Sequence, residues 1–547
     1  MFKDINFDTI DGPELKKLVG TLLNTIEQLN ERVDALTAEN QRLRDEINRL
    51  KGGNAKPRIA PQKTSQDHSS EQQRRTPQAW NKKPKKHLLT VTRTEVVPVP
   101  VSDLPPDAQF KGWEDYLVQE LRLVPDVTRY RRAKYYSAST GKTYLAPLPS
   151  ECVGHFGPAL RSLALYFGYV GNMSHAGIHR LFSDVGIHIS AGQVNNLLVN
   201  GQDGLHSNGH DVTLAGLASS AWQHTDDTAT RVNGKNQHCH VLCNPLYTAY
   251  QTSLTKDRLA VISTLLAGSP FTYVCDSAAL AYLQINGLGK AMRRQIAALF
   301  PDNGQALSEA EFTQRLASMP TLGPRQYKIV REAMALSGYW AQDEVPVVSM
   351  LLCDDAPQFN FVTHDQGLCW VHDARNYSKL APVIEHHKQI LAQFMDRYWN
   401  YYRELNSFRL TPEAEEAQHL NALFDDIFST KTDYEALNAR IEKTRRNKGM
   451  LLQVLDHPEI LLHNNPAELA VRRRVRKRDV SFGPRSNEGL KAWDTLMTLA
   501  ETARKQGISF LQYLIDYHSR SPDAASLAEL IRQAATQLNL SASWETT

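Results

Sequence analysis

The sequence has few cysteines and no long hydrophobic run. Six cysteines among 547 residues, with no Cys-x-x-Cys pair, exclude a disulfide scaffold and favour a reducing compartment. No stretch of about 18 uninterrupted apolar residues occurs, which excludes a membrane-spanning helix. The first residues mix acidic with apolar side chains and lack the hydrophobic segment of a secretory signal. We therefore expect a cytoplasmic protein.

A strong overall charge is also absent, but the charge is unevenly distributed. The chain has 62 basic and 59 acidic residues, a net charge of +3. Residues 51–86, however, contain ten basic residues and two acidic ones, with Pro, Ser and Gln throughout. Such a segment cannot bury enough apolar area to offset its ordering entropy, so we predict a disordered basic linker over 53–87. Nucleic acid is the expected partner of this linker, and a tether without a partner is the alternative.

A heptad pattern precedes this linker and predicts a coiled-coil zipper over 11–52. Leucines recur every seven residues at one position, namely Leu22, Leu29, Leu36, Leu43 and Leu50. The offset position holds Val19, Ile26, Val33, Asn40 and Ile47. β-Branched residues at a, Leu at d and one buried Asn favour a parallel homodimer. The alternative is an amphipathic helix packed on its own globular body.

Two small modules are expected after the linker. Residues 88–150 begin with LLTVTRTEVVPVPV, where apolar and polar side chains alternate as in a strand. They also contain a hairpin pattern that turns at Ser-Thr-Gly, so we predict a small β-rich module. Residues 151–210 predict three short helices, with Gly186 ending the second and Ser190 capping the third. A helix-turn-helix that reads a DNA groove fits this pattern, and plain packing is the alternative.

Residues 215–500 predict an α/β domain built around three acids. A meander of three strands and a helix is how a ribonuclease-H-like domain begins, and its first strand holds Asp226 and Asp227. A buried apolar strand ends at Asp354, where α/β sites form. Glu468 lies in the first turn of a helix that Asn465 can cap. Each acid alone has a structural alternative, but together they can hold two Mg²⁺ ions for phosphodiester chemistry.

Two of the three acids need a further remark, because another aspartate could take the place of Asp354 and basic residues follow Glu468. FTYVCD also reads as a buried strand, so Asp276 competes with Asp354 as the second metal ligand. Six of the seven residues from Arg472 to Arg478 are basic. Basic side chains beside a carboxylate centre can hold a phosphate backbone against it.

Several stretches resemble transposases of the insertion sequence 66 family. These are HTDDTATRVNGK, LCDDAPQF, LCWVHDAR and DHPEILLHNNPAELAVRRRVRKRDVSFGPRSNEG. The resemblance implies an Asp-Asp-Glu transposase with a ribonuclease-H-like catalytic domain over 215–500. It further implies helical insertions at about 278–342 and 385–450, and C-terminal helices over 501–547. Many members carry a cysteine-rich zinc module, but no cysteine precedes Cys152 here, so we expect no zinc.

Carried over residue by residue, the resemblance assigns roles to individual side chains. Asp226, Asp354 and Glu468 become the catalytic metal ligands for two Mg²⁺ ions. DNA contacts are expected from two groups of residues. The first is the basic run, with Arg472, Arg474, Arg476, Lys477 and Arg478. The second is Trp370, His372 and Arg375. The expected partners are the element's inverted-repeat ends, target DNA, a second copy of the chain and accessory proteins of the element, in a prokaryotic nucleoid. A nuclease that does not join DNA and a non-catalytic repressor are the alternatives.

Overall fold

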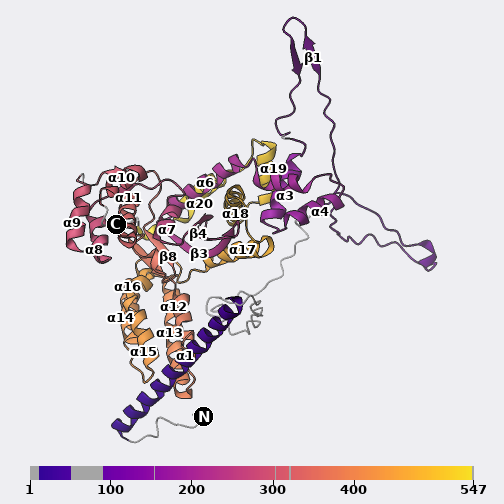
Figure 1. Ribbon diagram of the computed structural model, residues 1–547. Coiled ribbons are helices and arrows are strands. Elements are labelled where there is room, and N and C mark those ends of the chain that lie inside the picture. Colours follow the sequence, from indigo (N-terminus) through magenta and orange to yellow (C-terminus); the bar gives the residue numbers. More distant parts are fainter. Residues whose placement is uncertain (1–11, 51–89, 153, 302–303, 320–321, 545–547) are drawn as a thin grey trace.

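The computed structural model describes residues 12–50, 90–152, 154–301, 304–319 and 322–544. Figure 1 shows a central body of strands and helices from which a helical arm and an extended loop project. The predicted linker over 53–87 lies outside the described residues. Among the described residues, no helix combines the length and hydrophobicity needed to cross a membrane.

The N-terminal heptads form one long helix, α1 (Pro13–Leu50, 38 residues). One face of its first half packs on the arm, where Leu23 is 4% exposed beside Ile384. The heptad leucines face elsewhere, because Leu22, Leu29, Leu36 and Leu43 have exposed fractions between 50% and 56%. The helix therefore packs on its own body, as the alternative interpretation proposed, while most of the predicted zipper seam stays exposed.

Helix α1 caps two arm helices that lack caps of their own. The Glu27 carboxylate accepts hydrogen bonds from the backbone N–H groups of Val383 (3.1 Å) and Ile384 (2.9 Å), where α13 begins. Asn24 accepts a bond from the N–H of Glu435 and donates to the carbonyl of Asp433, both at 2.9 Å, where α15 begins. An anion at a helix N-terminus satisfies free N–H groups and the helix dipole. These bonds fix α1 across the arm.

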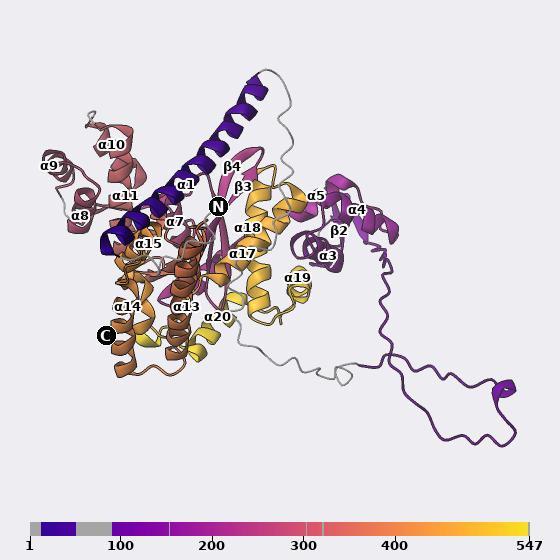
Figure 2. The ribbon, with the colours of Figure 1, turned by 90° about the horizontal axis from the view of Figure 1, so that it is seen from below.

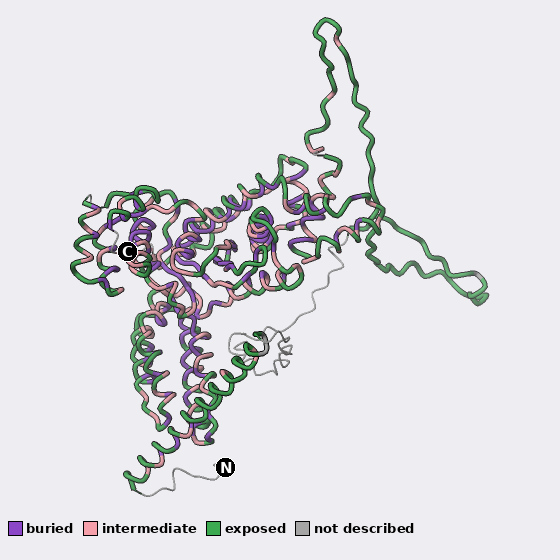
Figure 3. The backbone as a smooth tube through the Cα atoms, viewed as in Figure 1, coloured by how far each residue is buried: buried purple, intermediate pink, exposed green. Residues whose placement is uncertain are grey.

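The β-rich module expected over 88–150 is only partly present. β1 (Lys134–Ser137) and β2 (Lys142–Leu145) form the predicted antiparallel hairpin. The strand expected in LLTVTRTEVVPVPV is wrong for residues 90–100, which have no strand partner. Pro98 and Pro100 remove two of the backbone donors that a strand ladder needs. The segment instead runs as an extended, largely exposed loop (Figure 3).

The three helices expected over 151–210 are confirmed as α3 (Pro158–Tyr169), α4 (His175–Asp184) and α5 (Ala191–Val199). The Ser190 hydroxyl accepts a hydrogen bond from the N–H of Gln193 and caps α5. Gly186 ends α4 with a φ of +86°, a conformation that favours glycine. A fourth helix, α6 (Asp203–Ala218), runs through the expected boundary at 210.

A five-stranded sheet lies at the centre of the body, in the order β5-β4-β3-β8-β9. Its strands are β3 (Trp222–Val232), β4 (Lys235–Cys243), β5 (Thr248–Ser253), β8 (Met350–Cys353) and β9 (Asp365–Leu368). β4 runs antiparallel to both neighbours, whereas β3, β8 and β9 are parallel. Asn233 and Gly234, both with positive φ, make the tight turn between β3 and β4. The arrangement is consistent with the predicted ribonuclease-H-like fold.

Helices fill both expected insertions. α7 (Arg258–Leu265) follows the meander, and the first insertion contains α8 (Ser277–Ile285), α9 (Lys290–Leu299), α10 (Glu309–Ala317) and α11 (Pro324–Ala341), with short strands β6 (Tyr273–Val274) and β7 (Ala306–Leu307). The arm consists of α12 (Trp370–Ser378), α13 (Glu385–Phe408), α14 (Ala414–Phe428), α15 (Glu435–Arg446) and α16 (Lys448–Leu451). Figure 2 shows α1 lying across this arm.

The C-terminal helices complete the body. They are α17 (Asn465–Ser481), α18 (Asn487–Lys505), α19 (Phe510–Ser519) and α20 (Leu527–Leu538). α18 protects the edge strand β5, whose N–H groups donate to side chains spaced one helical turn apart: Thr252 to Asp494 (2.8 Å), Tyr250 to Thr498 (3.0 Å) and Thr248 to Thr502 (3.3 Å). An uncovered edge strand would be a site of aggregation. The expected boundary at 500 falls inside α18.

Candidate active site

Asp226 lies on β3, the central strand of the sheet. Its Oδ1 accepts a hydrogen bond from the N–H of Asp227 at 2.8 Å. The carboxylate of Asp227 is engaged differently, because it accepts a bond from the amide of Gln358 at 2.9 Å. The two adjacent acids therefore have different partners, as alternating side chains on a strand require.

Asp354 directly follows β8, which pairs with β3 in parallel. Its Oδ1 accepts a hydrogen bond from the N–H of Ala356 at 3.1 Å, which holds the carboxylate at the carboxyl end of the strand. Ligand sites of α/β sheets form at this end of parallel strands. The neighbouring Asp355 instead forms a salt bridge of 3.0 Å with Lys443 on the arm.

Glu468 lies in the first turn of α17, and Asn464 connects this helix to β3. The Asn464 amide donates to the carbonyl of Thr225 at 2.7 Å, one residue before Asp226, and its Oδ1 lies 3.0 Å from His224 Nδ1. We expected Asn465 to be the N-cap of this helix. In the structure Asn465 is already its first helical residue, and Asn464 occupies the N-cap position. Asn464 makes no side-chain cap, so it positions Glu468 against β3 instead.

The charges of the other two acids affect Asp226. Burial raises the pKa of Asp226 to about 7, and the negative charges of Asp354, Asp227 and Glu468 contribute to the increase. Burial also raises the pKa of Asp354, against the lowering effect of the nearby His372. A carboxylate whose pKa is raised by neighbouring negative charges is stabilised in its charged form by a nearby cation. Carboxylate oxygens are the ligands that Mg²⁺ takes in proteins, so the donor chemistry of the three acids suits a divalent metal. Their oxygens do not form a group within 4.8 Å of one another among the described residues, so a shared ion would have to draw the carboxylates closer together.

Two side chains of α12 contact Glu468. Arg375 donates to Glu468 Oε2 at 3.2 Å, and His372 Nδ1 lies 3.9 Å from Oε1. His372 and Arg375, which were predicted to contact DNA, therefore also contact the predicted metal ligand Glu468, and their contact with DNA stays a prediction. Among the described residues, Cys369, His372 and Glu468 form a group whose possible ligand atoms all lie within 4.8 Å of one another. Cys369 was not among the predicted site residues, although its spacing to His372 in Cys369-Trp370-Val371-His372 could have suggested the pair.

Three predicted DNA contacts are buried in the protein. The ring of Trp370 is fully buried among arm aromatics, and its Nε1 donates to the carbonyl of Leu451 at 2.9 Å. Arg474 is 1% exposed and pairs with Asp494 at 2.8 Å. Lys477 is 3% exposed and donates to the carbonyl of Gly168. None of the three side chains can reach a phosphate from these positions, so their assignment to DNA is corrected.

The burial of Arg474 and Lys477 follows a helical pattern that the sequence contains. The buried residues of α17 are Ala467, Ala470, Arg474 and Lys477, a spacing that defines one face of a helix. Arg472 and Arg476 lie on the opposite, exposed face. Arg478 is half-buried and donates to the carbonyl of Ala229. Only part of the basic run therefore faces solvent.

Asp276, the rival of Asp354, lies away from the central sheet. It follows β6, which pairs with β7 and not with any strand of the five-stranded sheet. Its carboxylate caps α8 by accepting a hydrogen bond from the N–H of Ala279 at 2.8 Å, and it accepts a second from Ser337 at 2.8 Å. These contacts give Asp276 a structural role.

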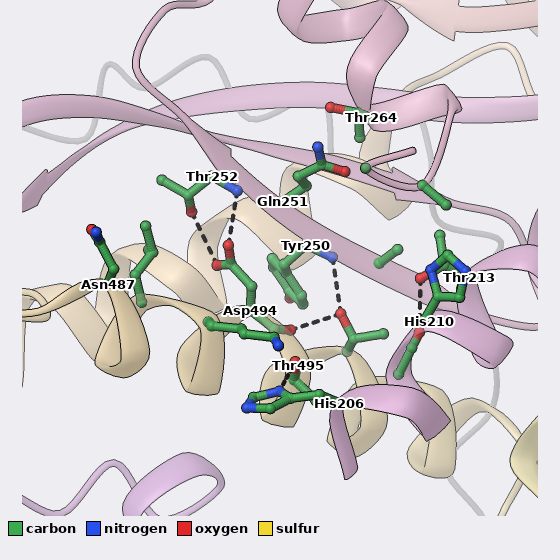
Figure 4. Close-up of a pocket in the computed structure, with 17 residues that line it drawn as sticks. His206, His210, Thr213, Tyr250, Gln251, Thr252, Thr264, Asn487, Asp494 and Thr495 are labelled. Atoms are coloured by element: carbon green, nitrogen blue, oxygen red, sulfur yellow. Dashed lines mark hydrogen bonds between the residues drawn. The ribbon is translucent and has the colours of Figure 1, made fainter. Parts of the chain in front are cut away.

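A separate pocket of about 320 Å³ lies between β5, α6 and α18 (Figure 4). Its lining is polar, with His206 Nδ1 2.7 Å from the hydroxyl of Thr495 and Asp494 bonded to Thr252. Asp226, Asp354 and Glu468 are not part of this lining. The pocket therefore belongs to the edge of the sheet that α18 covers.

Comparisons with known proteins show what the chain is similar to. Residues 335–492 match the family model "Transposase IS66 family", a span that includes Asp354 and Glu468. The chain is also 32% identical over 327 residues to "Uncharacterized protein y4jO" of Sinorhizobium fredii (strain NBRC 101917 / NGR234), covering 59% of this chain and 99% of that protein. No solved structure matches the chain.

Proposed function

The chain belongs to the IS66 family of transposases, and we propose that it catalyses DNA transposition with Asp226, Asp354 and Glu468 as its metal ligands. The observation that supports this assignment is the convergence of three elements. β3 and β8 are adjacent parallel strands, and Asn464 fastens the start of α17 to β3. The charges of Asp354 and Glu468 both contribute to the raised pKa of Asp226, which supports one shared site.

The family's Asp-Asp-Glu chemistry transfers phosphoryl groups between DNA strands. Water attacks the phosphodiester bond at the end of the element and releases a 3′-hydroxyl. That hydroxyl then attacks a phosphodiester of the target DNA in line, with no covalent bond to the protein. A pair of Mg²⁺ ions, when bound, activates the attacking oxygen and stabilises the leaving one.

The protein's own residues would bind and orient the DNA for these steps. Arg472 and Arg476 are exposed on α17, one and two turns beyond Glu468, and can hold a phosphate backbone next to it. Asn195 and Asn196 are exposed on α5, where amide side chains can read base edges. Holding both DNA ends in a fixed geometry lowers the entropic cost of the in-line attack.

Two copies of the chain would act together through α1. The exposed heptad leucines of α1 suit a parallel coiled coil, with Asn40 at an a position setting the number of strands. The bonds that fix α1 to the arm come from Asn24 and Glu27, which lie outside the a and d positions. The docking contact also includes Val19 and Ile26, two a positions of the first heptads, whereas the d-position leucines and the a positions from Val33 onward stay exposed for a second copy.

Strand transfer with the purified protein tests the proposal. The substrate is DNA that carries the inverted repeats flanking the gene, incubated with Mg²⁺ and a target plasmid. We expect joined products from the wild type and none from Asp226→Asn, Asp354→Asn or Glu468→Gln, with DNA binding retained. Cutting without joining would support a nuclease, and binding without cutting a repressor; either result would contradict the proposal.

A further inference from the structure

Helix α12 presents two polar side chains, one turn apart, to the carboxylate of Glu468. Arg375 contacts Oε2, and His372 Nδ1 faces Oε1 across 3.9 Å. Nδ1 and Oε1 are both buried, and neither has a hydrogen-bond partner. Buried polar atoms in proteins are nearly always paired, so two unpaired atoms that face one another need an explanation.

Arg375 determines which nitrogen of His372 carries the proton. Its Nη1 lies 3.1 Å from His372 Nε2. A guanidinium has donors only, so Nε2 must accept, and the proton of the neutral ring is then on Nδ1. The Nδ1–H group therefore points a donor at the acceptor Oε1. A distance of 3.9 Å is too long for a hydrogen bond, but such contacts in catalytic sites often shorten when substrate binds.

A zinc site made of Cys369, His372 and Glu468 is the competing explanation. Thiolate, imidazole and carboxylate are zinc ligands, and the three groups lie close together. A ligating nitrogen must be unprotonated, however, whereas the contact with Arg375 leaves the proton on Nδ1. The donor arrangement explains why Arg375 and His372 both face the Glu468 carboxylate.

The helix that carries this pair is held rigidly. Asp373, between His372 and Arg375, is 7% exposed and forms a salt bridge with Arg440 of α15. Its carboxylate also accepts hydrogen bonds from the hydroxyls of Tyr398 (3.1 Å) and Thr444 (3.0 Å). These contacts fix the position of α12, so His372 and Arg375 can orient the side chain of Glu468.

We propose that His372 and Arg375 are positioning residues that hold both carboxylate oxygens of Glu468 in the orientation needed for metal binding, with His372 acting through Nδ1–H. The inference rests on the proposed role of Glu468 as a metal ligand. Groups that orient metal ligands in this way typically account for about 10- to 100-fold in metal affinity or activity.

Three substitutions of His372 separate the possible roles. Asn places an amide N–H near the position of Nδ1, Gln places it near Nε2, and Ala removes the donor. In the full-length protein we measure Mn²⁺ affinity by electron paramagnetic resonance, and strand transfer on the repeat-bearing DNA. We expect His372→Asn to stay within a few fold of wild type, and His372→Gln and His372→Ala to lose about 10- to 100-fold in both measurements. His419→Asn, an exposed histidine on α14, is the matched control.

Two results would overturn the inference. Equal behaviour of the Asn, Gln and Ala variants would show that the position of the donor does not matter. Nitrogen hyperfine coupling in the spectrum of bound Mn²⁺, lost in His372→Ala, would make His372 a metal ligand instead. Failure of the proposed function is separately recognisable, because the wild-type protein would then give no joined products, whereas failure of this inference leaves strand transfer by the wild type intact.

Discussion

Arg474 on α17 and Asp494 on α18 form a buried salt bridge of 2.8 Å beneath the edge of the central sheet. The same aspartate accepts hydrogen bonds from the N–H and hydroxyl of Thr252 on β5. The guanidinium of Arg474 also lies 4.9 Å from the ring of Trp493. One ion pair therefore joins two C-terminal helices to the strand edge that they protect.

Removing one member of this pair should destabilise the protein strongly. We expect Asp494→Ala to lower the free energy of unfolding by about 3–5 kcal/mol, because Arg474 is left as a buried charge without its partner. Replacing both residues with Met and Leu should recover much of the loss, since two apolar side chains leave no buried charge. Chemical denaturation of the three proteins checks this; a double variant no more stable than Asp494→Ala would contradict it.

Exposure divides the basic run of α17 into residues that can bind DNA and residues that cannot. We expect Arg472→Ala with Arg476→Ala to weaken DNA binding for all sequences and to reduce the slope of log K against log salt by up to about 2, because each lost phosphate contact releases about one counterion fewer. Filter binding at several salt concentrations measures the slope. Lys477→Met, which removes a buried charge from the same helix, should leave the slope unchanged.

Dimerisation and docking of α1 should respond to different substitutions. Leu22→Ser with Leu29→Ser alters the exposed seam and should give a monomer in analytical ultracentrifugation, with α1 still docked. Glu27→Ala should leave the dimer intact but speed hydrogen exchange at the N–H groups of Val383 and Ile384, which lose their acceptor. A monomeric wild-type protein would contradict the zipper, and unchanged exchange in Glu27→Ala would contradict the docking.

The sequence predicted those parts of the fold that depend on local patterns. The turn at Asn233-Gly234, the cap at Ser190 and the leucine heptads each specify their own neighbourhood, and each element is present. Side-chain environments that depend on distant partners were not predictable in this way. Glu27 bonds the start of α13, more than 350 residues further along the chain. Trp370 packs on arm helices that come after it in the sequence. Likewise, the contact of His372 with Glu468 joins two segments whose distance only the folded chain defines.

Lys477 gives the protein a pH dependence that can be measured. Burial, helped by the nearby charge of Arg474, lowers the pKa of its ammonium group to about 7. Between that value and the ordinary pKa of lysine, the unfolded chain binds more protons than the folded one, so stability should rise as the pH increases from about 7 to about 10. Lys477→Met should lack this rise. Thermal denaturation across that range checks it, and parallel curves for the two proteins would contradict it.

Counting bound Mn²⁺ ions tests the central claim most directly, because the claim is that Asp226, Asp354 and Glu468 hold the metal. The decisive comparison is Asp354→Asn with Asp276→Asn in the full-length protein bound to repeat-bearing DNA. An amide keeps the shape of the side chain but removes the charge that binds the cation. We predict that Asp354→Asn loses bound Mn²⁺ while Asp276→Asn, altered at a residue that caps α8 and bonds Ser337, keeps the wild-type number. Loss of Mn²⁺ in Asp276→Asn together with full binding in Asp354→Asn would contradict the account.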